Sequence, residues 1–131
     1  MISFHLNTRD VEKHYKYSDS WKKIDDGGDP KIVARIVAAA VASPIIWFNG
    51  ERRSERYMYN DWIVLDFDKD VKLDYALKMF RDYTHVIGTT KRHLLLLDSD
   101  GKKIDRFRVW LRLAERCTSL SQYVYNTKKY A

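Results

Sequence analysis

Two aspartates separated by one residue are the side chains best placed for chemistry. Asp66 and Asp68 flank Phe67 at the end of the apolar run 62–67. Side chains two positions apart on a strand point to the same face, so we expect both carboxylates on one face. Two neighbouring carboxylates repel each other unless a proton or a cation lies between them. Oxygen donors of this kind suit Mg²⁺ or Mn²⁺, so the pair predicts a divalent-metal site. The alternative is that one aspartate caps the following turn while the other is solvated.

A polar cluster later in the chain offers groups that could bind a nucleotide. Residues 89–93 read Thr-Thr-Lys-Arg-His. In a strand–helix–strand layout, this polar end can return near the end of the aspartate strand. Thr90, Lys91 and His93 carry donors suited to a triphosphate or a sugar. For His93 the alternative is a hydrogen-bonded structural histidine.

Two arginines alternate with apolar residues further along. Arg106 and Arg108 are expected to share one sheet face, opposite Phe107 and Val109. Their guanidinium groups offer forked donors for phosphate. The alternative is an ordinary salt-bridged outer face.

In this order, the three motifs resemble those of the archaeo-eukaryotic primase superfamily, in its primase–polymerase branch of phage and plasmid type. The similarity covers about residues 45–115. Each motif is weak by itself, whereas their order and spacing together are more specific.

The resemblance implies a role for each matched residue. Asp66 and Asp68 would bind the catalytic metals, Mg²⁺ or Mn²⁺, and His93 would contact the incoming nucleotide with help from Lys91. Arg106 and Arg108 match an Arg-x-Arg strand of phage-type members and would neutralise phosphate charge. The implied activity is metal-dependent nucleotidyl transfer by a DNA primase in replication, acting on nucleotides and single-stranded nucleic acid.

One motif of the family has no clear match. The third acidic residue of the metal site would follow Arg108, where the chain offers Glu115. Three accounts stay open: a divided primase completed by a second protein chain, a minimal or degenerate member that binds without polymerising, or a substitute ligand. The substitutes are Glu115 and three aspartates expected to be solvated at a hairpin turn, Asp98, Asp100 and Asp105. A non-catalytic nucleic-acid-binding module and a metal-dependent nuclease are the alternative functions.

The net charge of +6 is concentrated near the end of the sequence. Residues 101–131 hold 8 basic and 2 acidic side chains, whereas residues 1–100 are balanced. A basic face suits phosphate contacts, and a solvated face with nothing bound is the alternative. The basic residues expected to contact nucleic acid are Arg52, Arg53, Lys102, Lys103 and Arg112.

The elements that must position these residues can be read from periodicity and turn signals. Asp29 and Pro30 predict the start of an amphipathic helix over 30–42, and the Asn49-Gly50 pair predicts a turn. The other expected elements are strands at 45–48, 62–67 and 85–90, a helix at 70–83, a hairpin with arms 94–97 and 107–113, and a helix at 120–129 capped by Ser119.

This order predicts an α+β domain, a mainly antiparallel sheet with helices packed on one face. The resemblance implies a primase–polymerase (RRM-like) catalytic core, complete or partial. We expect a single domain over 1–131, with a polar lead-in at 1–29 and a core at 30–131. The single cysteine, Cys117, excludes an internal disulfide, and no signal peptide or membrane span is evident. We therefore expect a soluble protein of the cytoplasm, host cytoplasm if phage-encoded.

Overall fold

The computed structural model describes residues 1–5, 21–67, 71–89, 101–103 and 105–130. The longer elements are, in chain order, β1 (Ile2–His5), β2 (Lys22–Ile24), α1 (Pro30–Ala39), β3 (Val41–Ser43), β4 (Ile45–Trp47), β5 (Tyr57–Phe67), α2 (Leu73–Met79), β6 (His85–Thr89), β7 (Phe107–Cys117) and α3 (Leu120–Tyr130). Two short 3₁₀ turns, η2 (Phe48–Gly50) and η3 (Ser54–Arg56), join β4 to β5.

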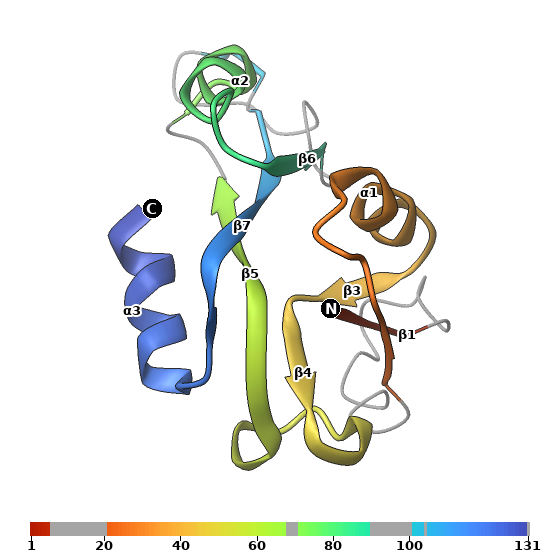
Figure 1. The fold of residues 1–131 in the computed structure, drawn as a ribbon. Coiled ribbons are helices and arrows are strands. Elements are labelled where there is room, and N and C mark those ends of the chain that lie inside the picture. Colours follow the sequence, from red (N-terminus) through yellow and green to blue (C-terminus); the bar gives the residue numbers. More distant parts are fainter. Residues whose placement is uncertain (6–20, 68–70, 90–100, 104, 131) are drawn as a thin grey trace.

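The strands form two sheets. A three-stranded sheet has the order β2-β1-β3, and a four-stranded sheet has the order β4-β5-β7-β6 (Figure 1). Every strand pair in the described part of the chain is antiparallel. The predicted α+β class with a mainly antiparallel sheet is therefore confirmed.

The two strands expected to carry the chemical groups run in the same direction. β5 and β6 both pair antiparallel with β7, which lies between them, and α2 connects β5 to β6. Phe107 of β7 lies opposite Phe67 on one side and opposite Thr89 on the other. The carboxyl ends of β5 and β6 therefore meet at the same edge of the sheet.

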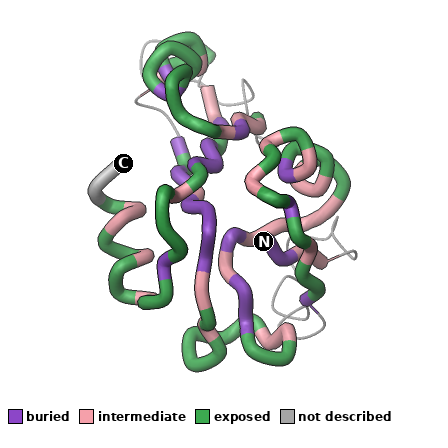
Figure 2. Tube along the Cα trace, in the orientation of Figure 1, coloured by how far each residue is buried: buried purple, intermediate pink, exposed green. Residues whose placement is uncertain are grey.

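Both faces of the four-stranded sheet are covered, which corrects the prediction of helices on one face. One face packs Ile63, Leu65 and Val109 against α2, with Tyr123 of α3 beside them. The opposite face packs Trp62 and Trp110 against the apolar side of α1 and against β1. Continuous buried runs lie at 60–63 in β5 and at 109–111 in β7, while α2 and α3 are largely exposed (Figure 2). The nearly all-apolar run at 62–67 reflects this burial on both faces.

The first predicted helix begins where expected but ends three residues early. The side chain of Asp29 accepts a hydrogen bond from the Lys31 amide, and Pro30 is the first helical residue. Ala40 has extended backbone angles, and Val41–Ser43 pairs with β1 as β3. The predicted end at residue 42 was wrong because the helical spacing of apolar residues continues past the end of the helix. The residues there form a strand instead, because they pair with β1.

The second predicted helix is also shorter than expected. α2 spans Leu73–Met79, and Lys72 at its N-cap position makes no side-chain capping bond. Instead, the carboxylate of Asp105 accepts a hydrogen bond from the Leu73 amide at 2.7 Å. Asp105 was expected to be solvated, and this long-range cap is the reason that it is not.

The segment predicted as a polar lead-in contributes two strands. β1 and β2 pair with each other, and Ile2 is fully buried in the core between α1 and the four-stranded sheet. Their lengths of four and three residues explain why no period was visible in the sequence.

The end of the chain follows the predicted order. β7 is longer than the predicted arm 107–113 and reaches Cys117, while the other arm, 94–97, lies outside the described residues. The hydroxyl of Ser119 accepts a hydrogen bond from the Gln122 amide at 3.3 Å, which confirms the predicted cap of the last helix.

Candidate functional site

Asp66 and Arg108 meet across two neighbouring strands. They are register partners on β5 and β7, and Arg108 Nε donates to Asp66 Oδ1 at 3.4 Å. Both side chains are more than half exposed, Asp66 at 54% and Arg108 at 59%. On the opposite face of the sheet, the rings of Phe67 and Phe107 stack with their centroids 5.0 Å apart. This contact joins the same ends of β5 and β7. The carboxylate is thus presented to solvent on a rigid strand end.

Arg108 lies between the two strand ends that the sequence predicted to converge. Gly88 of β6 is its register partner on the other side. Asp66, Arg108 and Gly88 therefore form one row across three strands, and the row spans roughly 10 Å between the outer Cα atoms. The chain leaves β6 at Thr89 on the same edge. The expected return of the second motif beside the aspartate strand is confirmed as far as Thr89.

Four residues of the predicted metal and nucleotide site fall in segments that the structure does not describe. Asp68, Thr90, Lys91 and His93 lie outside the described residues. Arg106 immediately precedes β7 and is half-buried at the same sheet edge, while Arg108 points away from the fully buried Phe107. The structure thus brings together Asp66, Arg106, Arg108 and the start of the 89–93 cluster.

The described residues contain no group of three or more His, Cys, Asp or Glu side chains that could hold a metal ion. Glu115 is exposed and lies on β7, seven residues beyond Arg108. At a strand rise of about 3.3 Å per residue, it is about 23 Å from the Arg108 position. Glu115 therefore cannot serve as the third ligand of a site at Asp66. Asp105 is engaged by the amide of Leu73.

The basic residues predicted to contact nucleic acid are spread over three places. Lys102 and Lys103 are exposed near the start of α2, where Lys72 Nζ donates to the Lys103 carbonyl at 3.5 Å. Arg52 and Arg53 are exposed between β4 and β5, at the opposite end of β5 from Asp66. The charge therefore does not form a single patch around the aspartate.

Arg112 is engaged in a buried polar cluster instead of being free for phosphate. Its guanidinium lies 3.5 Å from Asp26 Oδ2 and 5.7 Å from the centroid of the Trp62 ring. The side chain of Asp26 is fully buried and also accepts hydrogen bonds from Trp62 Nε1 at 3.0 Å and from the Gly28 amide at 2.9 Å. The Met1 ammonium contacts Asp26 Oδ1 at 2.5 Å. The position of Arg112 favours a structural role.

A second carboxylate, Asp61, belongs to the same cluster. Arg116 Nε donates to it at 2.9 Å, and the Met1 ammonium donates to it at 3.2 Å. Burial by itself would raise the pKa of both Asp26 and Asp61, but their cationic and hydrogen-bonded partners outweigh burial and lower each pKa below its ordinary value. Both groups are therefore held as carboxylates. The sequence signal for this role was weak, since Asp61 is simply a charged residue entering an apolar strand.

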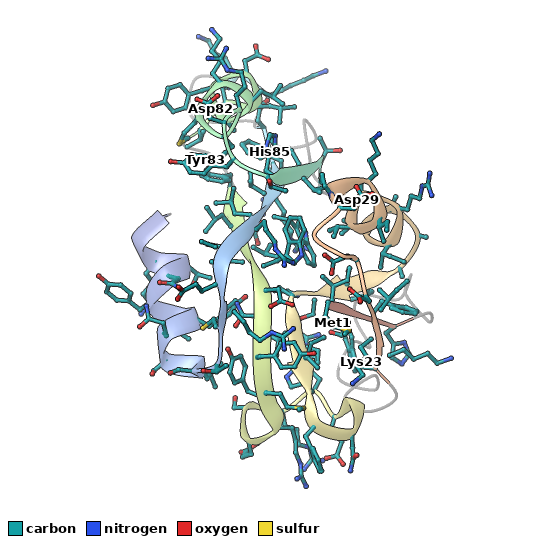
Figure 3. The ribbon with its side chains drawn as sticks, in the orientation of Figure 1. Met1, Lys23, Asp29, Asp82, Tyr83 and His85 are labelled. Carbon is teal, nitrogen blue, oxygen red and sulfur yellow. The ribbon has the colours of Figure 1, made fainter. Side chains whose placement is uncertain are left out.

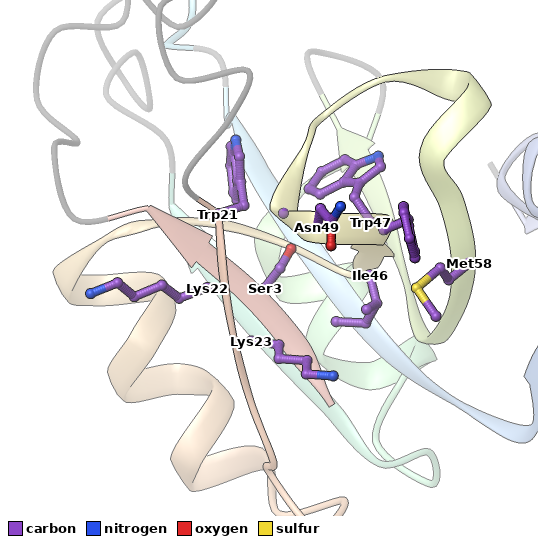
Figure 4. Close-up of a pocket in the computed structure, with 10 residues that line it drawn as sticks. Ser3, Trp21, Lys22, Lys23, Ile46, Trp47, Asn49 and Met58 are labelled. Atoms are coloured by element: carbon purple, nitrogen blue, oxygen red, sulfur yellow. The ribbon is translucent and has the colours of Figure 1, made fainter.

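Sequence reasoning missed a hollow of about 680 Å³ at the start of β5. Its apolar wall comes from Trp21, Ile46, Trp47, Phe48 and Met58 (Figure 4). Lys22 and Lys23 of β2 lie at its rim. The available signal was the concentration of Trp, Phe and Arg residues at 47–56, which a search for acidic motifs does not reveal.

No protein-family model, curated protein or solved structure matches this chain. Within the described ranges, no helix is long and apolar enough to cross a membrane.

Proposed function

We propose that this chain is the nucleotidyltransferase domain of a DNA primase–polymerase, acting alone or together with a second chain that supplies the third acidic ligand. The observation that carries the proposal is the row Asp66–Arg108–Gly88, which sets the predicted acidic, basic and nucleotide-binding segments at one sheet edge. The three segments are far apart in sequence, and their convergence is what the family resemblance requires.

The topology of the sheet also supports the proposal. The order β5-β7-β6, with α2 and α3 packed on one face, is a split β-α-β arrangement of the RRM-like kind. In this chain, the strand at the sheet edge beside β5 is β4, which precedes β5 in the sequence. The additional helix α1 covers the other face of the sheet.

The exposed ion pair between Asp66 and Arg108 is compatible with a metal site. Exposed pairs of this kind contribute only about 0–1 kcal/mol, so Asp66 can exchange Arg108 for a divalent ion at small cost. A bound Mg²⁺ or Mn²⁺ would supply activation of the attacking hydroxyl and neutralisation of the triphosphate. Asp66 and Asp68 would hold the ion, and Arg108, once released, would bind a phosphate oxygen of the nucleotide or template. His93 and Lys91 would position the triphosphate.

Primer synthesis on single-stranded DNA with labelled nucleotides and Mn²⁺ tests the proposal. Asp66→Asn should reduce synthesis by roughly 100-fold or more, because a metal ion contributes several kcal/mol of transition-state stabilisation. Asp82→Asn is the matched control, since Asp82 is also an exposed carboxylate paired with an arginine, Arg81. Synthesis by Asp66→Asn at the wild-type rate would overturn the proposal.

Mn²⁺-dependent nucleotide binding separates the two forms of the proposal. A chain that binds nucleotide through Asp66 but makes no product holds half a site and needs a partner chain. The second candidate function is a non-catalytic nucleic-acid-binding module, favoured by the pairing of Asp66 with Arg108 and by the absence of an acidic cluster among the described residues. Strand binding with neither synthesis nor metal-dependent nucleotide binding would support that module. Strand cleavage without added nucleotides would indicate a nuclease.

A further inference from the structure

The hollow at the start of β5 is preformed by contacts within its own wall. The rings of Trp21 and Trp47 meet edge to face, with centroids 5.1 Å apart. The Trp21 amide donates to the Gly50 carbonyl at 3.1 Å, so the β4–β5 connection is fixed against the start of β2. Trp21 and Trp47 are less than 10% exposed and serve as a rigid wall. A ligand would meet this wall without prior rearrangement.

The accessible part of the hollow is apolar and aromatic. Phe48 is 50% exposed and Met58 is 43% exposed, on the two segments that enclose the opening. The side chain of Asn49 also lines the hollow and offers both a donor and an acceptor. This combination suits a flat, polar-edged ring such as a nucleobase, which stacks on aromatic groups and forms hydrogen bonds at its edge.

Positive charge surrounds the opening. Basic side chains outnumber acidic ones by three within the rim and the adjoining loop; the residues are Lys22, Lys23, Arg52, Arg53 and Arg56 against Glu51 and Glu55. Arg52 lies over the rings of both Trp21 and Trp47, at 5.4 and 5.8 Å from their centroids. Lys23 points toward the side of Ile46 and Met58, whereas Lys22 points away (Figure 4). An anionic strand is the complementary partner.

We propose that this hollow binds one base of a single-stranded nucleic acid, with Lys23 contacting the adjacent phosphate. Met58 and Asp66 are eight residues apart on β5, so the hollow lies about 26 Å along the strand from the aspartate. It is therefore a strand-holding site separate from the proposed chemistry. The inference rests on the proposed function in one respect: a domain that extends a strand must hold its template away from the reacting end.

Anisotropy of a labelled single-stranded oligodeoxythymidylate, without metal or nucleotide, tests the inference. Phe48→Ala should weaken binding about fivefold or more, because stacking on one base is worth about 1–3 kcal/mol. Lys23→Gln should reduce the slope of log affinity against log salt by about 0.7, the value for one phosphate on a single strand. The matched controls are Lys78→Gln, the same charge change at an exposed lysine of α2, and Tyr83→Ala, an exposed aromatic far from Lys23 (Figure 3).

The outcomes separate this inference from the proposed function. Weaker binding by Phe48→Ala and Lys23→Gln, with both controls at the wild-type affinity, would support the site even if the chain makes no primers. Primer synthesis by a chain whose strand affinity is insensitive to Phe48→Ala and Lys23→Gln would overturn the site and leave the proposed function standing. Equal losses in the variants and their controls would indicate diffuse charge attraction and overturn it too. A wild-type chain that binds no single-stranded nucleic acid would also overturn the inference. The expected occupant of the hollow would then be an apolar side chain of a protein partner.

Discussion

Asp66 differs from the other described aspartates near the sheets in what surrounds it. Asp26 and Asp61 are buried and form ion pairs with cationic groups, whereas Asp66 is exposed and, within the described part of the chain, pairs with one arginine, Arg108. A buried carboxylate with several partners is costly to detach, while an exposed pair opens easily. Among these three, Asp66 is therefore the carboxylate that can change partner during a reaction.

Gly50 is the residue on which the hollow depends most directly. Its φ is +69°, and a Cβ there would lie 2.4 Å from the Trp21 carbonyl oxygen. Gly50→Ala should lower the free energy of unfolding by about 3 kcal/mol or more, combining left-handed strain with overpacking against backbone. Urea unfolding measures the loss.

Gly27→Ala is the control for Gly50→Ala. Gly27 also has a positive φ, +58°, but nothing lies within 4 Å of an added Cβ. Its cost should be limited to about 1–2 kcal/mol of backbone strain. Equal losses for the two variants would mean that the close approach to Trp21 adds nothing.

At the scale of elements, the first turn of α2 is capped by a carboxylate that is distant in the sequence. The Leu73 amide donates to Asp105 across 32 positions of sequence, and Ala76 of the helix and its C-cap residue Phe80 pack on the core. This contact also anchors the approach to β7 beside the Asp66 edge. A local capping residue would have made the start visible in the sequence, whereas a cap from the segment that precedes β7 does not.

Asp105→Ala should lower the free energy of unfolding by about 1 kcal/mol, the usual value of a helix cap. The Leu73 amide should also exchange its hydrogen faster, because it loses its acceptor. Asp105→Asn keeps an acceptor oxygen and should lose less. Unchanged exchange at Leu73 in Asp105→Ala would contradict the capping role.

At the scale of the whole molecule, the buried cluster joins the amino-terminal segment to the four-stranded sheet. Asp26 lies between β2 and α1, and its partners Trp62 and Arg112 lie on β5 and β7. Arg116 of β7 holds Asp61 of β5 and lies over the Tyr59 ring, 3.8 Å from its centroid. These contacts fix the orientation of β1 and α1 on one face of the sheet, and with it one side of the hollow.

The cluster makes stability depend on acid pH. Because the pKa values of Asp26 and Asp61 are lowered in the folded state, the unfolded chain takes up protons first as the pH falls. Their contribution is therefore present above about pH 4 and lost as the pH drops toward the lowered folded values. Urea unfolding at pH 7 and pH 3 should show the lower free energy at pH 3.

Asp26→Asn isolates the part due to one group. It should cost about 3 kcal/mol at pH 7, where a buried charge pair is broken, and less at pH 3. Asp25→Asn, the same change at the exposed neighbouring residue, should follow the wild type at both pH values. A constant gap between Asp26→Asn and wild type would exclude Asp26 as a source of the pH dependence.

The sequence by itself determined the features that depend on near neighbours. The start of α1 at Asp29 and Pro30, the turn at Asn49-Gly50 and a strand through the apolar run 62–67 were predicted correctly. Each follows from local chemistry: a capping side chain, a residue that tolerates positive φ, or an apolar period. The coarse α+β class follows from the order of these elements. The metal, nucleotide and catalytic roles of Asp66, Asp68 and His93 stay predictions.

Only the tertiary structure decided which groups meet. The register of β5 against β7 pairs Asp66 with Arg108 across 42 positions and keeps Glu115 far from both. The burial of Ile2 and the hollow against Trp21 likewise depend on contacts between segments distant in the chain. Strand pairing and long-range packing are selected by the free energy of the whole core, whereas local periodicity reports only the state of each segment. The sheet edge and the strand-holding hollow are for that reason properties of the fold.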